Sequence, residues 1–190
     1  MKINHQAIKA IYFHEMDRFR RTLGQSLVSP VLSTSLYFIV FGSVIGGYVQ
    51  KIDGISYGSY IVPGLLMLTL LTQSISNTSF GIFFPKFNGT IYEILAAPIS
   101  SFEVVLAFVG AGATKTLIVG IVIFITSTFF VEVQVKYPLL MIFLMLIVAF
   151  TFALFGFLIG LLSSNFEQLS VIPTLVLSLI HISEPTRRYS

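Results

Sequence analysis

Charged side chains are scarce in this chain of 190 residues. Asp, Glu, Lys and Arg together make up 10% of it, whereas apolar residues make up 55%. Soluble domains carry about 25% charged residues, so a surface this poor in charge faces lipid. The chain has no tryptophan, and the absence of cysteine excludes disulfides, thiol chemistry and Cys-ligated metal sites. The net charge of +3 is small, and we expect no nucleic-acid partner.

Long stretches without any charge locate the membrane spans. They cover residues 22–50, 54–85 and 137–166, and each exceeds the about 20 residues needed to cross about 30 Å of hydrocarbon. Trimming them to their apolar cores, and adding an apolar stretch interrupted only by Lys115, predicts four complete spans, near 31–48, 60–84, 104–131 and 139–162. A fifth begins at about residue 169 and has reached only residue 176. The expected fold class is an all-α, polytopic membrane protein.

The positions of the basic residues predict the orientation. On one side of the membrane lie Lys2, Lys9, Arg18, Arg20, Arg21 and Lys86. The other side holds only Lys51 and Lys136. Because cytoplasmic loops carry the excess of Lys and Arg, the N-terminus is expected in the cytoplasm.

Residues 4–27 predict an amphipathic helix that precedes the first span. Apolar residues recur at steps of three or four, at Ile8, Tyr12, Met16, Phe19 and Leu23. Such a helix with a basic remainder lies in the membrane interface, its cations near lipid phosphates; a soluble helix packed on a partner protein is the alternative. Pro30 is expected to mark the turn into the first span, since its missing N–H is harmless at a helix start.

Catalytic side chains are sparse. His5, His14 and His181 lie outside the spans and lack acidic partners at metal-ligand spacing. The string GAGATKT at 110–116 is not a phosphate-binding loop, because Val109 and Thr114 occupy the required glycine positions. We therefore expect no catalytic, cofactor-binding or metal-binding residue, and no enzymatic activity. The small residues at 110–113 and the GxxxG strings at 42–46 and 156–160 favour close helix contacts.

A few polar residues within the spans have two interpretations. Gln73, Ser76 and Asn77, with Thr69 and Ser79, cluster towards one side of the second span. They either line a path for an amphipathic substrate or, as we favour, bond to neighbouring helices. For Lys115 we favour an ammonium group that extends to the interface or packs against other residues. The alternative is that Lys115 belongs to the substrate path.

The segment 85–103 is the most informative loop. It opens with Pro85, turns at Asn88-Gly89, and runs through the helix-compatible residues 90–97 to Pro98. Ile91, Ile94 and Leu95 are apolar residues beside Glu93. Such a short helix inserts into a groove on a soluble partner or, alternatively, lies flat on the membrane.

Five segments resemble the type-2 ABC transporter permeases, and in particular a YadH-like group of them. They are DRFRR (17–21), SPVLSTSLYFIVFG (29–42), YIVPGLLML (60–68), GTIYEILAAPIS (89–100) and NFEQLSVIPT (165–174). The resemblance covers residues 8–176 in order. It implies that residues 4–27 form an elbow helix and that residues 28–176 form part of a membrane domain that normally has six spans.

The resemblance also implies a mechanism. Coupling to an ATPase would fall to Gly89, Thr90, Ile91, Tyr92, Glu93, Ile94, Leu95 and Pro98. Such permeases are dimers that work with a separate ATPase subunit, which binds the MgATP, so the permease needs no cofactor of its own. The expected function is export of a drug-, lipid- or glycan-like substrate across the bacterial cytoplasmic (inner) membrane. The alternative is a secondary carrier or a membrane assembly factor. A proton-coupled carrier usually has buried Asp, Glu or His residues, and their absence from the spans disfavours that alternative.

The last fourteen residues depart from this pattern. The run LSLIHISEPTR, which begins at Leu177, is the translation of a transposase adapter used to prepare sequencing libraries. Residues 177–190 are therefore expected to be foreign to the protein, the alternative being a genuine polar tail.

Overall fold

The computed structural model describes residues 4–45, 51–52, 55–133, 135–171, 174 and 178. Half of the expected start of a fifth span (residues 172, 173, 175 and 176 of 169–176), and residues 177–190 apart from Ser178, lie outside the described residues. Residues 166–171 are helical.

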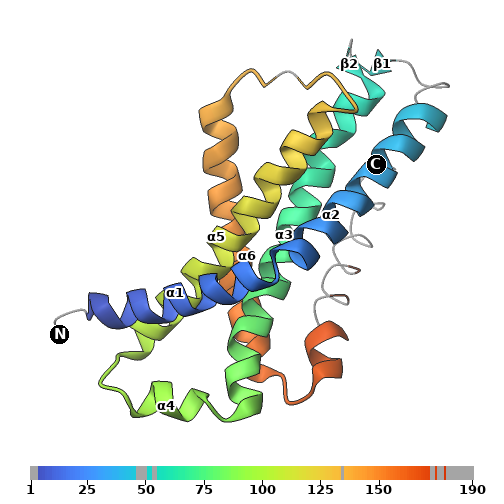
Figure 1. The fold of residues 1–190 in the computed structure, drawn as a ribbon. Coiled ribbons are helices and arrows are strands. Elements are labelled where there is room, and N and C mark those ends of the chain that lie inside the picture. Colours follow the sequence, from blue (N-terminus) through green and yellow to red (C-terminus); the bar gives the residue numbers. More distant parts are fainter. Residues whose placement is uncertain are drawn as a thin grey trace, which may run out of the picture.

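Three long helices form a bundle, and two further helices lie against it (Figure 1). The bundle consists of α3 (Tyr57–Asn88), α5 (Ser101–Thr128) and α6 (Pro138–Leu162). Helix α2 (Leu23–Tyr37), which continues as the π-helix η1 (Phe38–Ile45), packs against α5, and α1 (His5–Arg21) crosses α5. At one end of the bundle lies the short helix α4 (Ile91–Ala96). At the other end lies a hairpin of two short strands, β1 (Lys51–Ile52) and β2 (Ile55–Ser56).

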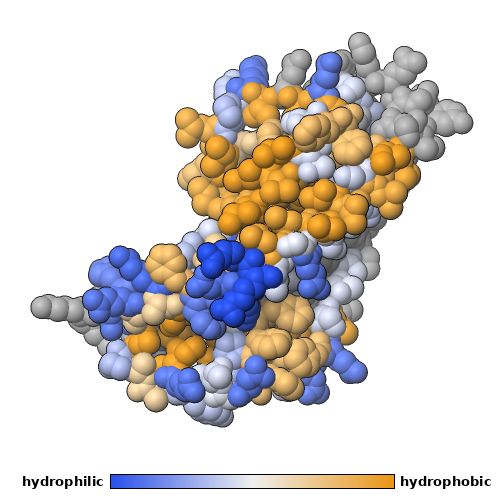
Figure 2. Space-filling view, viewed as in Figure 1, coloured by the Kyte–Doolittle hydropathy of each residue, from blue (hydrophilic) through white to orange (hydrophobic). Residues whose placement is uncertain are grey.

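This architecture confirms the all-α class. In the part of the chain that the structure describes, four helices are long and apolar enough to cross a membrane, one of them formed by α2 with the start of η1 (Leu23–Phe41). The hairpin is too short to change the class. Figure 2 shows a broad hydrophobic band over the half of the molecule towards the hairpin end, with hydrophilic residues beside it.

Small residues allow α3 and α6 to approach closely. A Cβ added to Gly156 would lie 2.5 Å from the carbonyl oxygen of Ile75, and one added to Gly160 would lie 2.5 Å from that of Ser79. Between these helices Ala149 is fully buried. The GxxxG string at 156–160 is therefore a helix contact, as predicted. Gly46 of the string at 42–46 lies outside the described residues.

The junction between the interfacial helix and the first span differs from the prediction. Helix α1 ends at Arg21 rather than near residue 27, because the backbone of Thr22 (φ −108°, ψ 14°) leaves the helical conformation. The next helix begins at once, at Leu23. Pro30 therefore lies inside α2 and does not mark its start.

The predicted cytoplasmic segment 85–103 begins inside a helix. Helix α3 continues through Pro85 to Asn88, because Phe83 is buried and holds the last turns against the bundle. The chain then turns at Gly89, whose φ of 77° favours glycine. The turn at Asn88-Gly89 is thus where the sequence predicted it.

Candidate functional site

Three polar contacts attach α1 to α5. The backbone N–H of Asn4 donates to Glu103 Oε1 (2.6 Å), and the Tyr12 hydroxyl donates to Thr114 Oγ1 (3.0 Å). The third contact joins Lys115 Nζ to Glu15 Oε2 at 2.7 Å. Because these contacts are spread along α1, they fix the position of this helix relative to α5.

The third contact belongs to a group of three charges, two of them buried. Glu15 is 2% exposed and Lys115 is 3% exposed. The guanidinium of Arg18 approaches the same Glu15 oxygen at 3.0 Å. An unpaired buried charge would cost several kcal/mol, so the single carboxylate compensates one of the two cations. The group as a whole carries one net positive charge.

Sequence reasoning missed Glu15 and assigned Lys115 a different environment. The Lys115 ammonium does not extend to a lipid interface; it is enclosed and paired, which corrects the favoured interpretation in part. A buried acid does face Lys115, namely Glu15, although it lies on α1 and not within a predicted span. Its position was the missed signal: it lies three residues after Tyr12 and four before Phe19, within the apolar stripe of α1.

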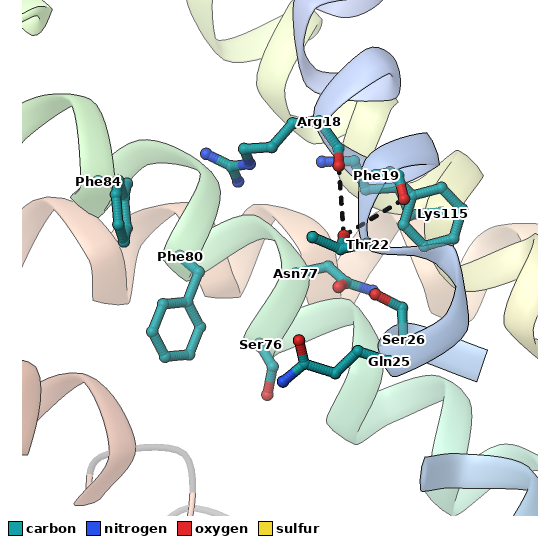
Figure 3. A pocket seen from close by; sticks show the side chains of 10 residues that line it. All are labelled: Arg18, Phe19, Thr22, Gln25, Ser26, Ser76, Asn77, Phe80, Phe84 and Lys115. Atoms are coloured by element: carbon teal, nitrogen blue, oxygen red, sulfur yellow. Dashed lines mark hydrogen bonds between the residues drawn. The ribbon is translucent and has the colours of Figure 1, made fainter. Parts of the chain in front are cut away.

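A groove of about 540 Å³ lies beside these charges, between α1, α2, α3 and α5 (Figure 3). Its lining residues are Arg18, Phe19, Thr22, Gln25, Ser26, Ser76, Asn77, Phe80, Phe84 and Lys115. In Figure 3 the Arg18 guanidinium extends from α1 towards the side of the groove formed by Phe80 and Phe84. The groove thus combines cationic, neutral polar and aromatic walls.

Of the polar residues predicted in the second span, two line this groove. Ser76 and Asn77 do so, whereas Gln73 is not among its lining residues. The Nδ2 atom of Asn77 is buried and makes no hydrogen bond with any residue that the structure describes. Such an unpaired buried donor is uncommon in folded proteins.

Two other polar residues of the second span form hydrogen bonds, but within their own helix. For these two residues the favoured interpretation, hydrogen bonds to neighbouring helices, is wrong. The Thr69 hydroxyl donates to the Leu65 carbonyl and the Ser79 hydroxyl to that of Ser76, all within α3. The side chain that does reach another helix is Ser74, whose hydroxyl donates to the Ala149 carbonyl of α6.

The residues predicted to couple to an ATPase form a turn and a short helix at the α4 end. Gly89 and Thr90 precede α4, and Pro98 follows it. Within α4 the apolar residues divide: Ile91 and Ile94 pack against the bundle core. The exposed face instead presents Tyr92 (72% exposed), Glu93 and Leu95 (65% exposed).

Lys86, counted from the sequence only as a loop cation, closes the end of α6. Its ammonium donates to the carbonyl oxygens of Leu161 (2.7 Å) and Ser163 (2.8 Å). These carbonyls have no partner within the helix end, so Lys86 joins the ends of α3 and α6. Among the described residues, no group of three or more His, Cys, Asp or Glu is placed to hold a metal ion.

Comparison with known proteins found a matching family model and several relatives. The family model described as ABC-2 type transporter matches residues 6–182. The chain is 37% identical over 172 residues to proteins named "Inner membrane transport permease YadH" from Escherichia coli (strain K12) and Shigella flexneri. The match covers 90% of this chain and 67% of each relative. No solved structure matches.

Proposed function

Because the chain belongs to the ABC-2 type transporter family and is a multi-pass transport permease, we propose that it is the membrane subunit of an ATP-driven exporter. Its energy comes from a separate ATPase subunit that binds MgATP, and the permease itself carries out no catalysis. The family match favours this function over a secondary carrier or an assembly factor. The observation that carries the coupling mechanism is the division of α4 into one packed and one exposed face.

The length of α3 supports docking of α4 on a soluble partner. Its 32 residues span about 48 Å at about 1.5 Å per residue, whereas the hydrocarbon core is about 30 Å thick. With the hairpin end of α3 at one membrane boundary, the α4 end extends about 18 Å beyond the other. This geometry favours a protruding α4 over a helix that lies flat on the membrane.

The two faces of α4 can transmit a force. The exposed residues Tyr92, Glu93 and Leu95 are free to contact the ATPase, while Ile91 and Ile94 contact the core that α3, α5 and α6 share. MgATP acting through the partner would shift the permease between inward-facing and outward-facing states only by stabilising one over the other. Movement of α4 is the proposed link.

The orientation, assembly and substrate belong to the same proposal. The bacterial inner membrane is the proposed location, with the N-terminus and α4 on the cytoplasmic side, where six of the eight basic residues counted for orientation lie. Two copies of the permease and two of the ATPase form the transporter, in contact with membrane lipid. The substrate is an amphipathic molecule of drug-, lipid- or glycan-like character.

Co-purification of the full-length permease with its ATPase tests the proposal. Replacing Tyr92, Glu93 and Leu95 together by alanine should abolish co-purification and ATP-dependent transport, because these side chains form the exposed face. Phe129→Ala is the matched control: it also removes an exposed apolar side chain, at the hairpin end of α5. Retention of the complex in the triple variant would refute the role of α4.

A further inference from the structure

We propose that the groove between α1, α2, α3 and α5 binds the phosphate-bearing head group of an anionic amphiphile at the membrane boundary, with Arg18 as the main donor. This site is separate from the α4 docking face and does not depend on an ATPase. Its evidence is the charge, the unpaired donor and the depth of the groove.

The charge of the groove favours an anion. Arg18 and Lys115 contribute two positive charges and Glu15 one negative charge, all within two ion pairs of 3.0 Å or less. Lys115 is enclosed, but Arg18 lies partly exposed at the groove, with a side chain 35% exposed. A guanidinium has five N–H donors, so its contact with Glu15 leaves donors for a phosphate, which arginine binds in bidentate fashion.

The unpaired amide of Asn77 is a second donor at this place. Its Nδ2 lacks a hydrogen-bond partner among the described residues, and the residue lines the groove opposite Arg18. Rotation of the amide about χ2 exchanges the positions of its oxygen and nitrogen, which turns the donor towards the groove. A phosphate oxygen there would satisfy a donor that the protein leaves unpaired.

The depth of the groove matches the level of lipid head groups. Asn77 lies eleven residues before Asn88, the last residue of α3, and therefore about 16 Å from that end of the helix. This distance is close to the about 18 Å by which α3 extends beyond the hydrocarbon. Arg18 lies in the last turn of α1, just before the chain enters α2 at Leu23.

The aromatic wall lies beside the proposed phosphate site. Phe80 and Phe84 lie one turn apart on α3, line the groove, and remain exposed. Because both follow Asn77 towards the α4 end of α3, they lie on the water side of the head-group level and face the head group rather than an acyl chain. The depth of the groove is therefore the feature that favours a membrane amphiphile over a soluble phosphate.

Native mass spectrometry of the full-length permease in detergent tests the site, with short-chain phosphatidylglycerol as the probe and phosphatidylcholine as the neutral comparison. We expect preferential binding of phosphatidylglycerol. Arg18→Gln should weaken it by about tenfold, since charge-assisted hydrogen bonds are about twice as strong as neutral ones. Arg18→Lys should restore part of the affinity. The matched control is Arg20→Gln, which removes the same charge from a side chain of α1 that is 79% exposed.

Asn77→Ala provides a second test in case the Arg18 variants misfold. It should not disturb folding through lost hydrogen bonds, because the Nδ2 atom that it removes bonds to no described residue. It should weaken binding while the helical content by circular dichroism stays unchanged. Equal losses in Arg20→Gln and Arg18→Gln, or equal binding of the two lipids, would overturn the proposal. If glycerol 3-phosphate competes for the groove as strongly as the lipid does, the site binds a soluble phosphate. That result would overturn the proposal that the ligand is an amphiphile.

Discussion

Replacing Glu15 by glutamine should destabilise the protein far more than an ordinary surface substitution. The variant keeps the size of the side chain but leaves Arg18 and Lys115 close together without their shared anion. Breaking a buried ion pair by removing one partner costs about 3–5 kcal/mol, and both Glu15 and Lys115 are almost fully buried. For a protein of this length, that loss corresponds to a decrease of about 10 °C in Tm.

Thermal unfolding in detergent, followed by circular dichroism, measures this effect. Asp17→Asn is the matched control, since Asp17 lies on the same helix, is exposed, and approaches Arg20 only at 3.9 Å. Exposed pairs contribute about 0–1 kcal/mol, so this variant should change Tm little. The double variant Glu15→Gln/Lys115→Met removes the stranded ammonium as well and should recover most of the loss. Equal destabilisation by Glu15→Gln and Asp17→Asn would refute the ion-pair argument.

Two further variants test how the bundle is held together. Gly156→Ala should lower the free energy of unfolding by about 1–3 kcal/mol, because the added Cβ meets the backbone of Ile75. The control is Gly24→Ala, whose added Cβ has no atom within 4 Å. An equal effect of the two variants on thermal unfolding would contradict close packing at Gly156. Lys86→Met should cost about 1 kcal/mol and increase hydrogen exchange at the end of α6, whereas the exposed Lys9→Met should do neither. Unchanged exchange at Ser163 would contradict the capping role of Lys86.

Much of the fold followed from the order of apolar and charged residues. The span predicted near 139–162 lies within α6, and that predicted near 104–131 lies within α5 except for its last three residues, because a helix that crosses lipid needs a long apolar stretch whatever packs beside it. The turn at Gly89 followed from local chemistry, since glycine tolerates a positive φ. The local end of α1 was harder to predict, because no glycine or proline occupies the break at Thr22.

The candidate site depended on contacts between distant parts of the chain. Glu15 and Lys115 are 100 residues apart, and nothing near either residue indicates that the two meet. The division of α4 into a packed face with Ile91 and an exposed face with Tyr92 likewise depends on where the bundle lies.

The sequence by itself therefore determined a polytopic helical membrane protein and its family resemblance, because hydropathy and local motifs are properties of contiguous residues. Only the tertiary structure decided that α1 is attached to α5 by a buried ion pair and that Arg18 and Asn77 line one groove. The physical reason is that the energy of a buried charge depends on its neighbours in space, and helix packing, rather than sequence spacing, brings those neighbours together.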